Sequence, residues 1–362
     1  MFLFENRRLD VIFNYMYTFR VSALIEQPNH NISVQFEDLS QSFPPYKAGQ
    51  FLTLSFMFGD REVRRSYSFS SSPIHSEPYE ITVKRVENGE ISRLLHHKIT
   101  VGDEIQVLDP QGIFTYEPTD ESIKTIVLFG AGVGVTPLYS ILKTALLGNS
   151  EVKVVLVYSN SSTEQTIFYE ELLKWKEQYP DRLHIEFIWS NVKNLIKARL
   201  NRNYILELVK THALDLGSTT FYTCGPLFYM DLVRFTLLGM GIPDEHIKRE
   251  TFHFPEEEED EDEKEEEEVD TTSYEVTLQF QGETYDLLIP YNKTILDVGL
   301  EQKIKLPYSC KSGMCSTCIS QVNEGAVRMD YNEVLTDREV ENGRCLICTS
   351  HPIKNGTIIT VL

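Results

Sequence analysis

The stretch Cys310-Lys311-Ser312-Gly313-Met314-Cys315-Ser316-Thr317-Cys318 decides the fold of the C-terminal part of the chain. Its three cysteines form a C-x4-C-x2-C array, and Cys348 follows Cys318 after 29 intervening residues. Such an array needs a tight loop whose backbone N–H groups can turn toward the sulfur atoms. The small residues that permit this turn are Ser312, Gly313, Ser316 and Thr317.

The spacing of these cysteines is that of plant-type ferredoxins, in which four thiolates hold one [2Fe–2S] cluster. The sequence therefore predicts a cluster with a set of four ligands, Cys310, Cys315, Cys318 and Cys348. A disulfide framework or a zinc site is the alternative, but zinc sites usually use paired C-x2-C units and one such pair is well placed here. Cys345 is the rival fourth ligand. The Leu-x-Cys context falls at Cys348, so we expect Cys345 to be a packed or free thiol.

The composition indicates a soluble protein of two to three domains, since the chain has 362 residues of which 41% are hydrophobic. No apolar run approaches the roughly 20 residues of a membrane span, so membrane insertion is not expected. Glu5, Arg7, Arg8 and Asp10 interrupt the apolar N-terminus, which argues against a secretory signal peptide. Six cysteines, four of them assigned to a cluster, favour a reducing compartment and hence the cytoplasm.

An acidic block at residues 256–268 accounts for more than half of the net charge of −20. Its twelve acids and one lysine contribute −11, which leaves −9 for the rest of the chain. A like-charge block of this length repels itself and stays extended. We interpret it as a solvated spacer at a domain boundary, within a linker at 255–271. The negative charge disfavours nucleic-acid binding.

Residues 19–118 are predicted to form many short strands and one helix. Alternating or β-rich stretches occur at 20–25, 32–36, 52–56, 79–86 and 102–107, and turn signals at 43–51 separate two of them. A short amphipathic helix begins after Gly89. This pattern is typical of a small antiparallel β-barrel.

Two motifs in this region resemble the flavin domain of the ferredoxin–NADP reductase superfamily. The first is Arg-x-Tyr-Ser at Arg65, Tyr67 and Ser68, and the second is Gly89-x-x-Ser92. The resemblance implies an arginine that holds a pyrophosphate, a tyrosine that stacks on the isoalloxazine and a catalytic serine near flavin N5. It also implies FAD as the flavin, with the second half of its site at Val83, Lys84, Gly89 and Ser92.

The nucleotide-binding half begins where the buried-strand run 124–129 leads into Gly130-Ala131-Gly132-Val133-Gly134-Val135-Thr136-Pro137 and then a helix over 138–147. Glycines in such a turn let the backbone approach a pyrophosphate at a helix N-terminus. Strands at 152–158, 184–189 and 220–222 and a helix at 168–177 continue the alternation of an α/β parallel sheet. The turn resembles the superfamily's G-x-G-x-x-x-P variant. This resemblance implies NAD(P)H binding by a set of residues, Gly130, Gly132, Gly134, Thr136 and Pro137.

Cys224-Gly225-Pro226 follows the last of these strands, and Arg249-Glu250-Thr251-Phe252 closes the domain. By resemblance, Cys224 faces the nicotinamide and flavin as a catalytic and cofactor-binding residue, Gly225 and Pro226 belong to the same site, and Phe252 covers the flavin. A buried structural thiol is the alternative for Cys224. The segment 158–162 lacks the arginine that would pair a 2′-phosphate; Lys193, Lys197 or Arg199 could substitute. The choice between NADH and NADPH stays open.

The resemblance covers about residues 18–362. It implies an FAD-binding barrel at 1–118, an NAD(P)-binding α/β domain at 122–254 and an α+β, β-grasp [2Fe–2S] ferredoxin domain at 272–362. The implied enzyme is an oxidoreductase that passes electrons from NAD(P)H through FAD and the cluster to a partner oxygenase, hydroxylase, desaturase or other redox protein. The alternatives are a redox sensor, a hybrid-cluster-type reductase without an oxygenase, and a terminal enzyme.

Overall fold

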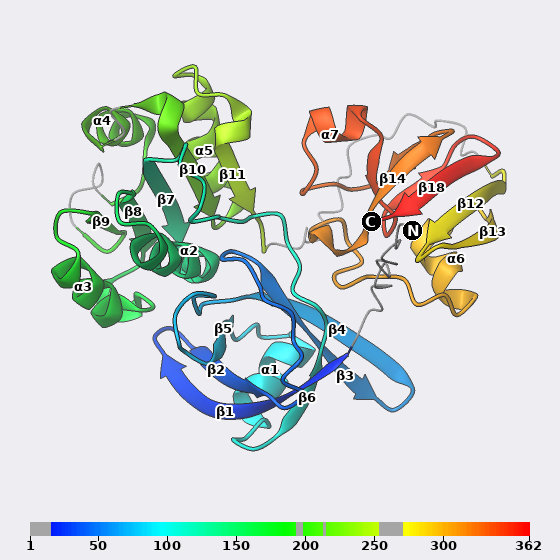
Figure 1. Ribbon diagram of the computed structural model, residues 1–362, viewed down its shortest axis with the longest axis horizontal. Helices are drawn as coiled ribbons and strands as arrows, with labels where there is room; N and C mark the ends of the chain where they lie inside the picture. The colour runs from blue at the N-terminus through cyan, green and yellow to red at the C-terminus, as the bar shows by residue number, and fades with distance from the viewer. Residues whose placement is uncertain (1–15, 193–197, 213–214, 253–270) are drawn as a thin grey trace, which may run out of the picture. The chain divides into compact units, whose positions relative to one another are not determined.

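The computed structural model describes residues 16–192, 198–212, 215–252 and 271–362. Contacts divide the chain into two compact units, Tyr17–Glu256 and Glu257–Leu362 with Met1–Met16. Figure 1 shows two lobes in the first unit, a barrel and a layered α/β lobe, and one smaller β-rich fold in the second. The predicted linker at 255–271 lies outside the described residues except for Thr271.

The barrel lobe is built from a six-stranded antiparallel sheet with the order β4-β3-β6-β1-β2-β5. Its elements are β1 (Tyr17–Gln27), β2 (Asn31–Asp38), β3 (Phe51–Phe58), β4 (Arg61–Ser68), β5 (Tyr79–Lys84), α1 (Glu90–His97) and β6 (Glu104–Val107). An antiparallel bridge between Phe69 and Ile81 brings the two edges of the sheet together. The predicted barrel is therefore confirmed, with side chains such as Phe19, Phe36 and Leu54 filling its core.

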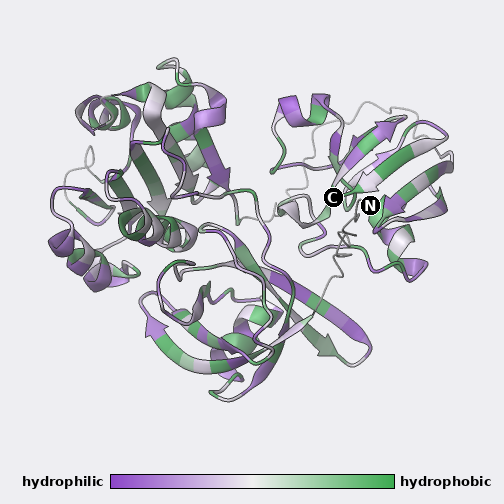
Figure 2. Cartoon of the chain, in the orientation of Figure 1, coloured by the Kyte–Doolittle hydropathy of each residue, from purple (hydrophilic) through white to green (hydrophobic). Residues whose placement is uncertain are grey.

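The α/β lobe carries a five-stranded sheet in the order β11-β10-β7-β8-β9, and all of its pairings are parallel. Its elements are β7 (Thr125–Ala131), α2 (Val135–Gly148), β8 (Lys153–Asn160), α3 (Tyr169–Gln178), β9 (Leu183–Trp189), α4 (Arg202–His212), β10 (Thr219–Cys224), α5 (Leu227–Leu238) and β11 (Ile247–Glu250). Hydrophobic residues concentrate on these strands (Figure 2), because helices cover both faces of the sheet.

Strand order reverses at β7, whose neighbours are β8 on one side and β10 on the other. Ligands of open α/β sheets bind at the carboxyl ends of the strands at such a switch point. Helix α2 begins at Val135, earlier than the predicted 138. Pro137 lies in its first turn, where a missing N–H costs no intrahelical hydrogen bond, so the proline does not delay the helix.

The second unit has a five-stranded mixed sheet ordered β13-β12-β18-β14-β16 and a two-stranded ribbon of β15 and β17. Its elements are β12 (Tyr274–Phe280), β13 (Glu283–Ile289), α6 (Ile295–Glu301), β14 (Ile319–Glu324), β15 (Val327–Met329), α7 (Asp337–Glu341), β16 (Arg344–Leu346), β17 (Ser350–Pro352) and β18 (Thr357–Val361). The cysteine loop lies between α6 and β14. Among the described residues, no helix is both long and apolar enough to span a bilayer.

Candidate functional site

The cysteine loop is held in a conformation that directs backbone groups at sulfur. The N–H of Ser312 donates to the Sγ of Cys310 at 3.4 Å. Gly313 has a φ of +72°, and a Cβ there would lie 2.5 Å from the carbonyl oxygen of Tyr331. Glycine is therefore required at this point of the loop. The Oγ of Ser312 is buried and has no hydrogen-bond partner in the part of the chain that the structure describes.

The four predicted ligands form a row of sulfur contacts, Cys315–Cys310–Cys348–Cys318. Hydrogen bonds from Cys315 and Cys348 lower the pKa of Cys310, and the same contacts raise the pKa of Cys315 and of Cys348. Cys345 is fully buried in the core of this unit, and burial raises its pKa to about 12. The structure thus brings the four predicted cysteines together and leaves Cys345 packed outside their row of contacts. In the described ranges, no three His, Cys, Asp or Glu side chains are grouped for a single metal ion.

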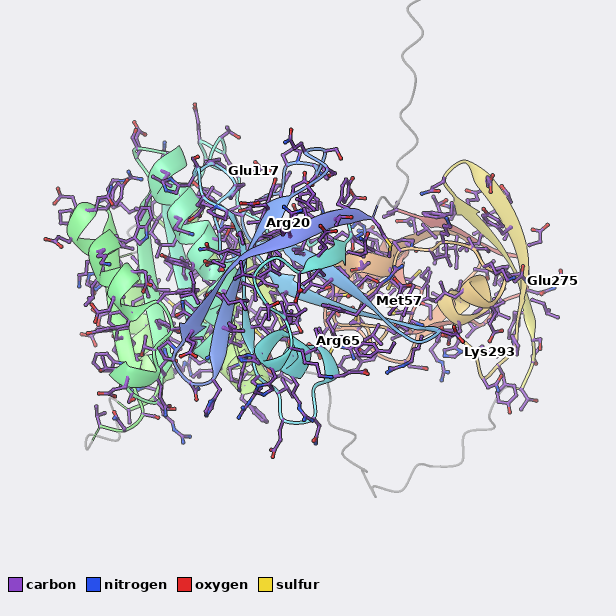
Figure 3. The ribbon with its side chains drawn as sticks, turned by 90° about the horizontal axis from the view of Figure 1, so that it is seen from below. Arg20, Met57, Arg65, Glu117, Glu275 and Lys293 are labelled. Carbon is purple, nitrogen blue, oxygen red and sulfur yellow. The ribbon has the colours of Figure 1, made fainter. Side chains whose placement is uncertain are left out.

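The Arg-x-Tyr-Ser motif forms the end of β4. Arg65 (labelled in Figure 3) is exposed and donates to its neighbouring carbonyl, that of Arg64, at 2.7 Å; it has no ion pair with another described residue. Tyr67 pairs in register with Leu52, and burial raises its pKa. An unpaired guanidinium on the surface of the barrel is available for an anionic ligand.

Ser68, Glu250 and Cys224 meet where the barrel contacts the α/β lobe. The Oγ of Ser68 donates to the Oε2 of Glu250 at 3.0 Å, although 182 residues separate them. Glu250 is the register partner of Cys224 on the neighbouring strand. Burial raises the pKa of Glu250 to about 8, partly offset by the hydrogen bond from Ser68. Burial and the nearby carboxylate raise the pKa of the Cys224 thiol.

The second half of the predicted flavin site consists of Val83 and Lys84 on β5, and of Gly89 and Ser92 at the start of α1. Val83 is buried and its carbonyl oxygen lies 3.1 Å from Nε2 of His96, while Lys84 is exposed. The hydroxyl of Ser92 accepts from the N–H of Val86 at 3.1 Å, so it is occupied in the turn that precedes the helix. A Cβ at Gly89 would lie 2.4 Å from that hydroxyl.

The first turn of α1 is free of side-chain caps from the described residues, because Gly89 occupies the N-cap position. Its N–H groups can therefore bind an anion, with Ser92 shaping the turn rather than offering its hydroxyl. Arg61 bonds both carboxylate oxygens of Glu90, at 2.7 and 2.9 Å, and balances the one acid in this first turn.

The glycine turn after β7 is closely packed against the Cys-Gly-Pro turn after β10. A Cβ at Gly134 would lie 2.3 Å from the carbonyl oxygen of Cys224, and one at Gly225 would lie 2.9 Å from the Cβ of Ala131. Gly132 has a φ of +55°, which only glycine adopts at little cost. The carboxyl ends of β7 and β10 thus form one surface made of backbone.

The buried Tyr158 and the half-buried Tyr229 orient this turn, and sequence reasoning missed both. The hydroxyl of Tyr158 donates to the carbonyl of Gly132 at 3.0 Å, and that of Tyr229 donates to the carbonyl of Gly130 at 3.1 Å. These bonds fix the carbonyls of Gly132 and Gly130, and no described side chain caps the N-terminus of α2, which is where an anion would bind. The cue in the sequence was a tyrosine at the carboxyl end of β8 and another just after Cys-Gly-Pro.

The remaining predicted residues are placed as follows. Thr136 is buried and its hydroxyl donates to the carbonyl of Val133 at 3.1 Å. Pro137 is buried within α2, and Pro226 is the N-cap of α5. Phe252 is exposed at the end of a described range, and Arg199 is exposed. Lys193 and Lys197 lie outside the described residues.

Three family matches follow the order of these sites along the chain. They are an oxidoreductase FAD-binding domain at residues 29–116, an oxidoreductase NAD-binding domain at 128–234 and a 2Fe-2S iron-sulfur cluster binding domain at 278–352. The ferredoxin reductase component of 3-ketosteroid-9-alpha-monooxygenase from Rhodococcus rhodochrous is 35% identical over 92% of this chain and 93% of its own length. The chain belongs to this family of reductase components.

One further relative supports this assignment, and one solved structure shows the same fold. One of the subunits of 1,2-phenylacetyl-CoA epoxidase from Escherichia coli (strain K12) is 30% identical over 87% of this chain and 88% of its own length. The crystal structure of phthalate dioxygenase reductase has a TM-score of 0.60 at 23% identity and covers 96% of this chain and 98% of its own, which shows the same fold. The predicted superfamily, three-domain order, oxidoreductase class and cofactor set of the reductase are thereby confirmed.

The residues of the reductase fit these cofactors. Four cysteines linked in a row by three pairwise sulfur contacts match the donor set of a [2Fe–2S] cluster. Arg65, which has no ion pair among the described residues, and the N-terminus of α1, which no described side chain caps, match a flavin pyrophosphate. The glycine turn of 130–134, into which Cβ atoms would intrude, matches the close approach of a dinucleotide.

The raised pKa of Glu250 predicts how the stability of the flavin-free reductase depends on pH. A carboxyl that titrates at about 8 when folded and near 4.5 when unfolded keeps its proton only in the folded state between these values. The free energy of unfolding should therefore fall as pH rises from 4.5 through 8, at up to about 1.4 kcal/mol per pH unit. In Glu250→Gln this fall should be flatter, as urea titrations at several pH values would measure. The exposed Glu151→Gln is the control, and equal slopes for Glu250→Gln and the wild-type protein would contradict the prediction.

Proposed function

We propose that the reductase takes a hydride from NAD(P)H and delivers single electrons to a partner oxygenase through its 2Fe-2S domain. The contact of Ser68 with Glu250, in register with Cys224, carries this proposal, because it joins the flavin motif to the carboxyl end of the nucleotide-binding sheet. The names of the relatives, a reductase component of a monooxygenase and a part of an epoxidase, support an oxygenase as the partner. A desaturase, hydroxylase or other redox protein fits the same chemistry.

When bound, FAD supplies the conversion of a two-electron hydride into single electrons that the [2Fe–2S] cluster carries onward. Arg65 and the first turn of α1 would hold the flavin pyrophosphate, and Tyr67 would stack on the ring. The turn at 130–134 with Thr136 and Pro137 would hold the dinucleotide, and Cys224, Gly225 and Pro226 would lie against the nicotinamide.

Ser68 and Glu250 together hold a proton where the flavin motif contacts the carboxyl end of the nucleotide-binding sheet. Because burial raises the pKa of Glu250 to about 8, its carboxyl is protonated at neutral pH while Oε2 accepts from Ser68. Cys224 is fully buried and remains a neutral thiol that keeps water away from the nicotinamide seat. Phe252, whose ring is exposed just after β11, would lie over the flavin ring.

We propose domain boundaries at 1–118, 122–254 and 272–362, with a linker at 255–271, and a cytoplasmic location. All six cysteines are described, and none of them forms a disulfide, which suits a reducing compartment. The family matches at 29–116, 128–234 and 278–352 each fall within one proposed domain.

A chain truncated after residue 254 tests this function. It should bind FAD and reduce ferricyanide with NAD(P)H at a rate close to that of the full chain, because ferricyanide accepts electrons from flavin directly. Its reduction of cytochrome c should fall at least about tenfold, since that route needs the cluster. Equal cytochrome c rates for both chains, measured in the steady state, would remove the claim that the 2Fe-2S domain delivers the electrons.

A further inference from the structure

An ion pair between the buried Lys143 and the half-buried Glu77 links the α/β lobe to the barrel. The Nζ of Lys143 on α2 lies 2.6 Å from the Oε1 of Glu77, and the two side chains are 4% and 24% exposed. The same ammonium lies 4.6 Å from the ring centroid of Tyr139. Lysine is seldom buried to this degree unless it is paired, because an ammonium loses its hydration.

The ion pair belongs to a larger polar contact between α2 and the segment that follows the flavin motif. The hydroxyl of Ser140 donates to the carbonyl of Ser71 at 2.6 Å, and the hydroxyls of Ser72 and Thr144 lie 2.8 Å apart, all buried. Glu77 also accepts from the backbone N–H of Ser72. Positions 140, 143 and 144 share one face of α2, and each of these three polar side chains contacts the segment 71–77 of the barrel.

Both sides of this contact are close along the chain to the proposed flavin and nucleotide sites. Ser71 and Ser72 follow Ser68 within four residues. Lys143 lies nine residues after Gly134 on one continuous helix, a distance of about 13 Å. A shift of α2 along the barrel would therefore move the glycine turn relative to the flavin motif.

Stability alone does not account for an ion pair at this position. Apolar residues of similar volume are often as stabilising as a buried ion pair or more so. A charged hydrogen bond differs from an apolar contact in requiring one distance and one direction. We propose that Lys143 and Glu77 are positioning residues for hydride transfer, which fix the nicotinamide-bearing lobe against the flavin-bearing lobe. The inference rests on the proposed function of these lobes.

The test separates positioning from stability with three variants, Lys143→Met, Glu77→Leu and the double variant. Each single variant leaves one charge buried and should lower the melting temperature. The double variant replaces the pair with apolar side chains and should recover most of that loss. Hydride transfer should nevertheless stay about tenfold slower in the double variant, because a displacement of a fraction of an ångström between reacting groups is costly.

The measurement is the rate of flavin reduction by saturating NADH or NADPH in the FAD-loaded full chain, followed by stopped flow. The KM for the nucleotide should change little, and the long-wavelength charge-transfer absorbance between nicotinamide and flavin should weaken. Lys124→Met is the matched control, since Lys124 forms an exposed pair with Glu151 at 3.3 Å in the same lobe. Its hydride-transfer rate should equal that of the wild-type reductase.

A double variant that recovers both its melting temperature and its hydride-transfer rate would overturn the inference. If the double variant loses FAD, Ser140→Ala answers the same question, because it removes one hydrogen bond of this contact and leaves both charges in place. It should slow hydride transfer a few-fold with full FAD content, and an unchanged rate would overturn the inference. Failure of the proposed function would give a different result from failure of this inference, because the wild-type chain itself would then show no flavin reduction by either nucleotide.

Discussion

Replacing any one of Cys310, Cys315, Cys318 and Cys348 with serine should abolish the visible absorbance of the iron–sulfur cluster, whereas Cys345→Ala should keep it. The first four sulfurs touch one another in a row, and each supplies a thiolate that serine cannot match as a ligand for iron. Cys345 is buried among apolar side chains in the same core. Bound iron and the absorbance spectrum of each purified variant measure the effect.

The Cys345→Ala variant is the matched control, because it removes a buried thiol three residues from a predicted ligand. Loss of volume in a packed core should cost it about 1 kcal/mol of stability without loss of iron. If Cys345→Ala loses the cluster and Cys348→Ser retains it, the fourth ligand has been assigned to the wrong cysteine.

Gly134→Ala should slow flavin reduction by NAD(P)H roughly 10- to 100-fold without loss of FAD. A Cβ at this position would lie 2.3 Å from the carbonyl oxygen of Cys224 and 2.9 Å from the backbone nitrogen of Gly225. Both are main-chain atoms, so they cannot rotate away as a flexible side chain could. The glycine turn and the Cys-Gly-Pro turn would have to separate, which displaces the nicotinamide seat.

Gly217→Ala provides the control in the same lobe, because a Cβ there would meet only the Asp215 side chain, at an ordinary contact distance of 3.4 Å. Stopped-flow reduction with NADH and NADPH, together with the FAD content, measures both variants. Wild-type reduction rates in Gly134→Ala would show that the close contact of the two turns does not matter for hydride transfer.

The sequence predicted the parts of the site that depend on short spacings. Cys310, Cys315 and Cys318 and the turn at 130–134 are recognisable because a cluster and a dinucleotide each impose a local pattern on fewer than ten residues, and Cys348 follows at the spacing of the same pattern. The alternation of strands and helices likewise predicted the parallel sheet, whose apolar strands β7 and β8 are buried on both faces.

Contacts between distant residues could not be predicted in this way. Ser68 and Glu250 are 182 residues apart, and nothing in either local stretch shows that they share a hydrogen bond. Glu250 was visible as part of Arg249-Glu250-Thr251-Phe252, but its high pKa follows from burial, which only the fold creates. The hydroxyl of Ser92 had the right position for a phosphate ligand, yet the turn before α1 uses it.

The serines after the flavin motif illustrate the same limit. Ser70, Ser71 and Ser72 read as polar strand or turn residues, which are common in barrels. In the structure Ser70 bonds Glu80 on β5, whereas Ser71 and Ser72 bond α2. The contacts of Ser71 and Ser72 with α2 depend on how the barrel packs against the α/β lobe.

The central claim, that electrons leave the reductase through the cluster, is tested most directly by cytochrome c reduction in Cys348→Ser and Cys345→Ala, with NAD(P)H as the donor. Ferricyanide reduction in the same samples controls for the flavin and nucleotide sites. The account predicts a loss of cytochrome c reduction of about tenfold or more in Cys348→Ser, a wild-type rate in Cys345→Ala, and full ferricyanide reduction in both. An undiminished cytochrome c rate in a Cys348→Ser protein that holds no iron would contradict it.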